Sequence, residues 1–361
     1  MEKWIRVAGS FTIVFFFFFY VGAQFLGGGK TINSLFGVDP NLGMLITAAV
    51  IIPYTIYGGF RSVVYTDVVQ AIVMITALVV GPIAGIVYIH NTPGLFASSI
   101  PEALRASGPS YFSFTGALSG FAAGAAIMGG FSWFFGYLGG QPQLSIRFMA
   151  IKNPVEARRA RNIGIAWTVL AYIGALAIGW IGIAIFGPKG LEDPEVVMPL
   201  VMFRIFPDII AAIMVTGAIA AMISTADSLL ILSSTELSEN LIKPLDGRAG
   251  RTNDLARSRI TTAVLAAIAL VLAYLSPSKV IYTIVGFVWA GIGGTFSVVI
   301  LLTLFWKRYH GRAVLCTIVG GLLFTIVWQG AGMEPVLTAR VATFGFSMLA
   351  AVVATLALPR A

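Results

Sequence analysis

Continuous apolar runs constrain the fold of this chain more than any motif does. An α-helix rises 1.5 Å per residue, so about 20 apolar residues cross the hydrocarbon core of a bilayer. Ten runs approach or reach that length, at residues 6–26, 43–58, 63–88, 115–138, 162–186, 208–235, 260–275, 280–306, 313–330 and 337–358. They are continuous rather than alternating with period two, which argues against a membrane β-barrel. The sequence predicts an all-α polytopic membrane protein with about ten transmembrane helices.

The basic residues predict how such a bundle is oriented. If Met1 is cytoplasmic, 17 of the 23 Lys and Arg residues fall on cytoplasmic loops and ends. An excess on one side is what the positive-inside rule describes, and it predicts that both ends of the chain are cytoplasmic. The net charge of +8 is then a signal of topology. Because the charges are spread over short loops, no nucleic-acid partner is expected.

One apolar run, 208–235, carries a polar face. Ala221, Ser224, Thr225 and Ser228 recur at i, i+3, i+4 and i+7 and share one side of a helix, and Asp227 adds a carboxylate. Hydroxyl, carboxylate and carbonyl oxygens are ligands for hard cations, and an ionisable residue inside a membrane helix suggests a functional site. These residues predict a site for a small cation such as sodium, in a transporter. The alternative for the carboxylate is a structural hydrogen bond to another span.

Asp67 is the other carboxylate that falls inside a predicted span. It lies about five residues from the start of the run 63–88, at a depth similar to that of Ser224 and Ser228 in their own helix. Two helices can therefore bring the three side chains together. The alternative is that Asp67 caps a helix start together with Thr66, or pairs with Arg61.

Several segments in order resemble those of a known family. Residues 57–70 and 222–230, with Ser233 and Ser234 after them, resemble signatures of the sodium/solute symporter family. Residues 140–150, 289–291 and 327–328 are similar to its sodium/proline symporter branch. The resemblance implies that Ser224, Thr225 and the carbonyl of Ala221 hold the main sodium ion. It implies a second sodium site at Asp67 and Ser228, where Asp227 departs from the serines found in those members.

The prediction of a substrate site depends on aromatic residues and on a glycine-rich run. Glycines interrupt the run 115–138 and the residues after it, which favours a discontinuous helix, a common location for a transporter's substrate site. Trp133 and Tyr137 are four residues apart on one face, and aromatic faces can enclose a pyrrolidine ring. The resemblance adds Tyr20 and Pro142 to this set, with one extra glycine before Pro142. The alternative is that these aromatic residues only pack or mark the membrane interface.

The resemblance also implies an organisation. The whole chain, 1–361, is expected to be a single transporter domain with the inverted-repeat fold and with the family's first helices missing. Residues 1–90 would be the remainder of the first repeat, 115–306 the second repeat, and 313–358 peripheral C-terminal helices.

These observations predict sodium-coupled symport of proline or a related amino acid by alternating access, in a bacterial inner (plasma) membrane. The expected partners are the solute, sodium and the lipid bilayer. No cofactor beyond sodium and no obligate protein partner is expected. The alternatives are a symporter for another small carboxylate such as pantothenate, or a non-transporting sensor or remnant. An enzyme is not expected, because the spans contain no histidine and no activated-nucleophile signature.

Overall fold

The computed structural model describes residues 1–242 and 254–359, except the side chains of residues 59–61 and 254. All regular secondary structure in this part of the chain is helical. Ten segments are long and apolar enough to cross a membrane: Glu2–Phe36, Pro40–Gly58, Ser62–Asn91, Gly120–Met149, Pro154–Phe186, Asp208–Ile242, Leu255–Leu275, Ile281–Phe305, Gly311–Gly330 and Ala339–Ala357. They coincide with the ten predicted runs, so the all-α class and the span count are confirmed.

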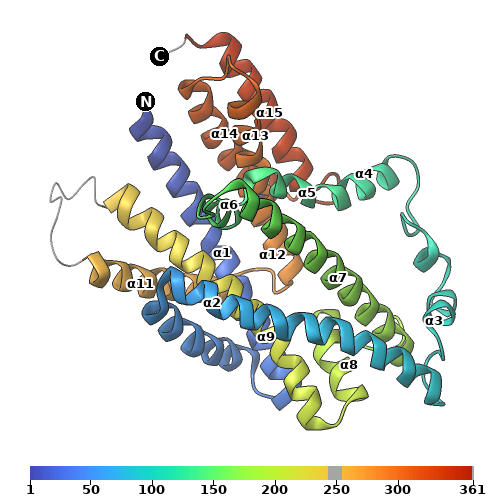
Figure 1. The fold of residues 1–361 in the computed structure, drawn as a ribbon. Coiled ribbons are helices and arrows are strands. Elements are labelled where there is room, and N and C mark those ends of the chain that lie inside the picture. The colour runs from blue at the N-terminus through green and yellow to red at the C-terminus, as the bar shows by residue number, and fades with distance from the viewer. Residues whose placement is uncertain (243–253, 360–361) are drawn as a thin grey trace.

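The first two helices account for three of these spans. α1 (Glu2–Phe36) ends at Gly37, whose φ of +64° closes the helix in the left-handed conformation that glycine tolerates. α2 (Pro40–Asn91) begins after Asp39, whose carboxylate accepts two N–H groups of the first turn. A straight helix of its 52 residues would be about 78 Å long, more than twice the hydrocarbon thickness. α2 instead bends between its two apolar halves (Figure 1).

Two of the spanning segments are broken rather than straight. The first consists of α4 (Gly120–Phe131), α5 (Trp133–Phe135), the π-turn η2 (Gly136–Gly140) and α6 (Pro142–Met149), with Gly139 at φ +90°. The second runs from α12 (Ile281–Val288) through the π-turn η5 (Trp289–Gly294) to α13 (Thr295–Phe305). The breaks touch: a Cβ on Gly140 would lie 2.6 Å from the carbonyl oxygen of Gly293. The predicted discontinuity in the fourth span is therefore present.

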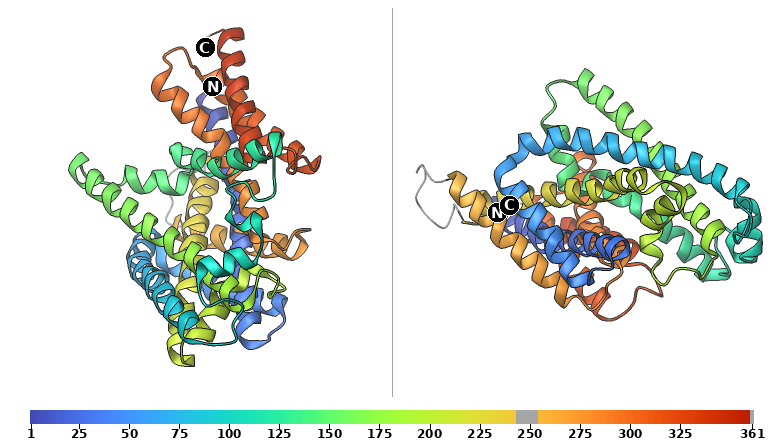
Figure 2. Two further views of the ribbon diagram at one scale, coloured as in Figure 1. Left: turned by 90° about the vertical axis from the view of Figure 1, so that its right-hand side faces the viewer. Right: turned by 90° about the horizontal axis from the view of Figure 1, so that it is seen from below.

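The remaining helices surround these breaks. α9 packs against α1, α2 and α11, and their shared core contains the buried Phe16, Phe17, Leu229 and Leu230. α14 and α15 lie side by side, and α15 ends at the same end of the molecule at which α1 begins (Figures 1 and 2). The bounds are α3 (Ile100–Ala106), η1 (Pro109–Phe112), α7 (Pro154–Phe186), η3 (Pro194–Val196), α8 (Val197–Ile205), α9 (Asp208–Thr235), η4 (Glu236–Ile242), α11 (Asp254–Leu275), α14 (Gly311–Gly330) and α15 (Ala339–Ala357).

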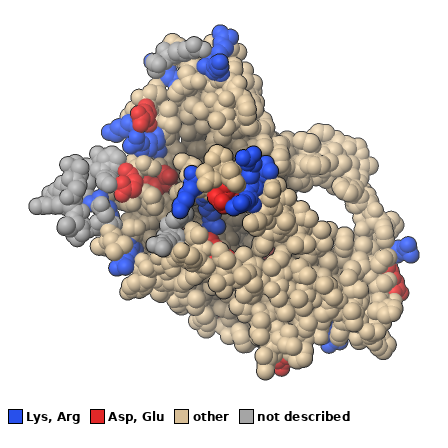
Figure 3. All heavy atoms as spheres, in the orientation of Figure 1, with Lys and Arg blue, Asp and Glu red and all other residues tan. Residues whose placement is uncertain are grey.

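The surface is that of an integral membrane protein. Large apolar side chains of α7, among them Ile163, Ile165, Val169 and Ile173, are exposed rather than packed. On the face that Figure 3 shows, broad areas carry no charged residues, and Lys, Arg, Asp and Glu gather in a few patches. Such faces are stable against lipid and would be unfavourable in water.

A polar group that we call the Lys30 network ties three elements together at the end of α1. Lys30 Nζ lies 2.7 Å from Asp193 Oδ2 and 2.6 Å from Glu195 Oε2. Glu195 also accepts the backbone N–H groups of Ile281 and Tyr282 at the start of α12, both at 3.1 Å. Burial alone would raise the pKa of the Asp193 carboxyl, but the bonds from Lys30 and from the Glu195 N–H bring it below its ordinary value.

Candidate functional site

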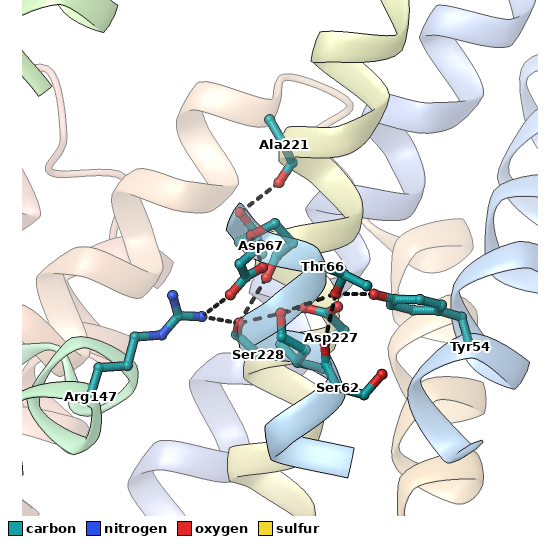
Figure 4. A network of polar contacts seen from close by, with 11 residues as sticks. Tyr54, Ser62, Thr66, Asp67, Arg147, Ala221, Asp227 and Ser228 are labelled. Carbon is teal, nitrogen blue, oxygen red and sulfur yellow. Dashed lines mark hydrogen bonds and ion pairs between the residues drawn. The ribbon is translucent and has the colours of Figure 1, made fainter. Parts of the chain in front are cut away.

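The carboxylate of Asp67 connects α2 to α9. Ser224 Oγ on α9 donates a hydrogen bond to Asp67 Oδ1 at 2.5 Å, and Ser228 lies one turn further along the same helix (Figure 4). Asp67 is 9% exposed. Its side chain therefore lies at a helix–helix interface, as the comparison of depths predicted.

The alternative role for Asp67, capping the start of a helix together with Thr66, does not hold. Because α2 is continuous, Asp67 lies well inside a helix and does not cap a helix start. The hydroxyl of Thr66 is engaged separately, with the carbonyls of Ser62 and Val63 and with the hydroxyl of Tyr54. A pairing with Arg61 falls outside the described side chains.

Arg147 is the member of this site that the sequence reasoning missed. Its Nη2 lies 2.6 Å from Asp67 Oδ2 and 2.6 Å from Ser228 Oγ. It is positioned by α6, the short helix after the break in the fourth span. The sequence analysis counted this arginine only among the cytoplasmic charges and within a family motif. What it lacked was the direction of α6, which depends on the backbone at Gly139 and turns the arginine toward α2 and α9 (Figure 4).

The other predicted sodium ligands lie on the same helix, around Ser224. Thr225 Oγ1 donates to the carbonyl oxygen of Ala221 at 2.8 Å, and Ser228 Oγ donates to the carbonyl oxygen of Ser224 at 2.8 Å. A hydroxyl that donates to the carbonyl four residues earlier has its hydrogen bond within its own helix and needs no partner on another helix. A carbonyl oxygen has two lone pairs, so Ala221 can still accept a second ligand.

Asp227 is the most buried group of the set. It is fully buried, and in the described part of the chain its Oδ2 has no hydrogen-bond partner. Its Oδ1 receives a 3.5 Å contact from Ser228 Oγ, which is at the limit of a hydrogen bond, and the backbone N–H of Ser228 also bonds the carboxylate. Among the described residues, no hydrogen bond joins Asp227 to another span, which was the alternative role for this carboxylate.

The chemistry of this cluster suits a small hard cation. Its ligating atoms are carboxylate, hydroxyl and carbonyl oxygens, and in the described residues no group of three His, Cys, Asp or Glu could hold a transition metal. The oxygen atoms form two groups that share Ser224: one with Ala221 and Thr225, the other with Asp67 and Ser228. In the second, the guanidinium of Arg147 already supplies a positive charge.

Two of the predicted substrate residues lie in one aromatic cluster. Trp133 packs against Trp289 with ring centroids 5.4 Å apart, and Tyr137 packs against Trp289 at 5.0 Å. The hydroxyl of Tyr137 lies 3.1 Å from that of Tyr172 on α7. Tyr20, on α1, lies near enough to Tyr137 and Tyr172 to interact with them electrostatically. The cluster thus joins residues of the two broken segments with neighbours on α1 and α7.

Pro142 does not line the same pocket as Trp133 and Tyr137. It is the first residue of α6 and lines a pocket of about 270 Å³ with Gly139 and Glu236. Trp133 and Tyr137 line a different pocket, of about 790 Å³, along α7. The structure therefore brings together Trp133, Tyr137 and Tyr20, but it separates Pro142 from them.

Known proteins resemble the chain along most of its length. The high-affinity proline transporter PutP of Bacillus subtilis is 34% identical over 350 residues, covering 96% of this chain and 72% of that protein. Sodium/proline symporter 2 of Staphylococcus saprophyticus and the osmoregulated proline transporter OpuE of Bacillus subtilis are each 31% identical over 333 residues, 91% of this chain. The chain spans 63% and 65% of these two relatives, respectively.

The fold has a solved counterpart. The substrate-bound, outward-open structure of a Na⁺-coupled sialic acid symporter superposes with a TM-score of 0.76, covering 99% of this chain and 75% of that one. At 17% identity this likeness concerns the fold alone. The family model of the sodium:solute symporter family matches residues 2–321. The chain belongs to the sodium:solute symporter family.

Proposed function

We propose that the protein couples the movement of sodium to uptake of proline or a closely related solute, by alternating access between two broken helices and their neighbours. The observation that carries this proposal is the contact between Asp67 on α2 and Ser224 on α9, beside Ser228. It supports the proposal because carboxylate and hydroxyl oxygens of two helices, the atoms that hard cations prefer, meet inside a membrane protein. The names of the relatives, which are proline transporters and sodium/proline symporters, support the choice of ion and solute.

Sodium is proposed to bind in two subsites. Ser224, Thr225 and the carbonyl of Ala221 form the first, and Ser224 again, with Asp67, Ser228 and Asp227, forms the second. Because Ser224 belongs to both, occupancy of one subsite changes the ligands offered to the other. Arg147 competes with sodium for Asp67 and Ser228 in the second subsite, since its guanidinium donates to both.

The solute is proposed to bind at the aromatic cluster. Trp133, Tyr137 and Tyr20 offer apolar ring faces with hydroxyl and indole donors at their edges, which fits a small ring that carries a carboxylate and an amine. Pro142 is proposed to act through the broken helix, because it lines a pocket other than that of Trp133 and Tyr137. Another small carboxylate such as pantothenate is the alternative solute.

The excess of basic residues on one set of loops supports an orientation with both chain ends in the cytoplasm of a bacterial cell. A membrane potential of 100 mV then favours entry of each sodium ion by about 2.3 kcal/mol. Sodium entry can thus drive uptake of the solute against its gradient.

The test is uptake of labelled proline into vesicles that contain the purified full-length protein. An inward sodium gradient is expected to drive accumulation above equilibrium, and an equal potassium gradient is not. Excess unlabelled pantothenate should leave proline uptake unchanged; strong competition would move the assignment to that class of carboxylate. Ser224→Ala and Thr225→Ala are expected to weaken sodium activation far more than substrate affinity at saturating sodium. Saturable proline binding without any sodium-driven accumulation would overturn the proposal in favour of a sensor.

A further inference from the structure

A buried arginine on the last helix contacts the break in the fourth span. Arg340 is the second residue of α15 and is 4% exposed. Its Nε donates to Ser132 Oγ at 2.9 Å, and Ser132 in turn donates to the carbonyl oxygen of Gly129 at 2.6 Å. Its Cζ lies over the ring of Trp133, 4.2 Å from the ring centroid. The guanidinium therefore reaches the residue that separates α4 from α5 and the aromatic ring next to it.

The charge of Arg340 is not balanced by any carboxylate of the described residues, among which no Asp or Glu forms an ion pair with it. A buried charge without compensation is strongly unfavourable. Here the compensation comes from the carboxyl end of α4, which carries a partial negative charge, and from the electron-rich faces of two rings, Trp133 and Tyr282. The position of the guanidinium is thus tied to the end of α4 and to the orientation of these rings.

The surrounding backbone leaves room for this side chain and for the helix that carries it. A Cβ on Gly286 of α12 would lie 2.6 Å from Arg340 Nη1, and a Cβ on Gly129 of α4 would lie 2.8 Å from Thr338 Cγ2. One turn after Arg340, Phe344 stacks on Phe135 of α5 with ring centroids 4.1 Å apart. The start of α15 therefore contacts both broken segments at once (Figure 1).

We propose that Arg340 is a positioning residue, which holds the indole ring of Trp133 in its orientation toward Trp289 and Tyr282 and thereby sets the affinity for the solute. The proposal rests on the assignment of the aromatic cluster as the solute site. It gives α15, a helix outside the two predicted repeats, a direct part in substrate selection. The guanidinium lies over the ring of Trp133, Trp289 packs edge-on against this ring, and the Nε1 of Trp133 donates to the hydroxyl of Tyr282 at 3.3 Å.

The transport test compares three variants in vesicles. Arg340→Gln keeps a hydrogen-bond donor but removes the charge, and it is expected to raise the KM for proline about tenfold. The maximum rate and the sodium half-saturation should stay at the wild-type values. Arg340→Lys keeps the charge without the planar fork, so an intermediate KM is expected. Thr343→Val is the matched control, because it breaks a buried 2.9 Å contact between α15 and α14 without touching Trp133.

If the wild-type protein transports proline, either of two results would overturn the proposal. One is a KM for Arg340→Gln equal to that of the wild type. The other is an equal change in KM and sodium half-saturation that Thr343→Val reproduces, since this is what a general loss of packing would cause.

A second readout does not depend on transport. The chain has seven tryptophans, so protein labelled with 5-fluorotryptophan should give seven fluorine resonances, and Trp133→Phe identifies the one of interest. Arg340→Gln should shift that resonance, and Thr343→Val should leave it in place. An unshifted resonance in Arg340→Gln refutes the positioning role. If the wild type binds no proline but the resonance shifts, the proposed function fails while the positioning of Trp133 stands.

Discussion

Removing the positive charge of Arg147 should make the protein bind sodium more tightly. In the structure its guanidinium donates to Asp67 and Ser228, two of the proposed sodium ligands, each at 2.6 Å. A sodium ion at Asp67 must displace this group or bind beside it, and either is unfavourable. Arg147→Gln replaces the guanidinium with a neutral amide on a shorter side chain, so the repulsion of the ion is lost.

The size of the effect follows from the geometry. Two unit charges about 4 Å apart interact by roughly 4 kcal/mol at an effective dielectric constant of about 20. The side chain of Arg147 is 39% exposed and that of Asp67 is 11% exposed, so solvent screens a large part of this interaction. We take about 1 kcal/mol as the remainder. That free energy corresponds to about a fivefold lower half-saturation for sodium.

The assay is sodium activation of proline uptake at fixed proline concentration, measured from low to saturating sodium at constant ionic strength. Arg159→Gln is the matched control, because it removes the same charge from an exposed side chain that pairs with Glu156 on the surface, away from the proposed sites. Arg147→Lys should behave more like the wild type, since it keeps the charge. An unchanged or higher half-saturation in Arg147→Gln, or the same decrease in Arg159→Gln, would refute the idea that Arg147 competes with the ion.

Three further predictions concern other parts of the structure. Ser224→Ala should raise the sodium half-saturation more than any other single hydroxyl removal on α9, because both subsites use this side chain; uptake titrations with sodium measure it. Gly174→Ala should lower the melting temperature in detergent, because its Cβ would overlap the carbonyl of Leu78. Such overpacking lowers the free energy of unfolding by about 1–3 kcal/mol. Gly164→Ala, whose Cβ meets open space, should melt like the wild type. The stabilisation from Asp193, whose folded pKa is depressed, is present at neutral pH and is lost as pH falls through that pKa; below about pH 4 the wild type should lose stability more steeply than Asp193→Asn.

Much of the fold was predictable from the sequence because membrane helices leave a direct signal. Each span needs about 20 apolar residues, and all ten predicted runs coincide with the spanning segments. The join between the second and third spans was not predictable, since the sequence shows them as two separate apolar runs, 43–58 and 63–88. In the structure α2 is helical throughout.

The site was predictable where residues are close in sequence or equal in depth. The spacing of Ser224 and Ser228 places both on one face of α9, and the depth of Asp67 brings it to the same level. Arg147 was not predictable in this way. Its approach depends on backbone angles at Gly139, which no periodicity encodes. The separation of Pro142 from Trp133 has the same cause, because both flank that break.

The most direct test of the account is sodium binding to Asp67→Asn, measured with radioactive sodium on purified full-length protein without solute. The account predicts at least about a tenfold loss of affinity relative to the wild type, because the change removes the carboxylate that joins α2 to α9 at the ion site. Sodium affinity equal to that of the wild type would show that the ion does not bind where Asp67 and Ser224 meet.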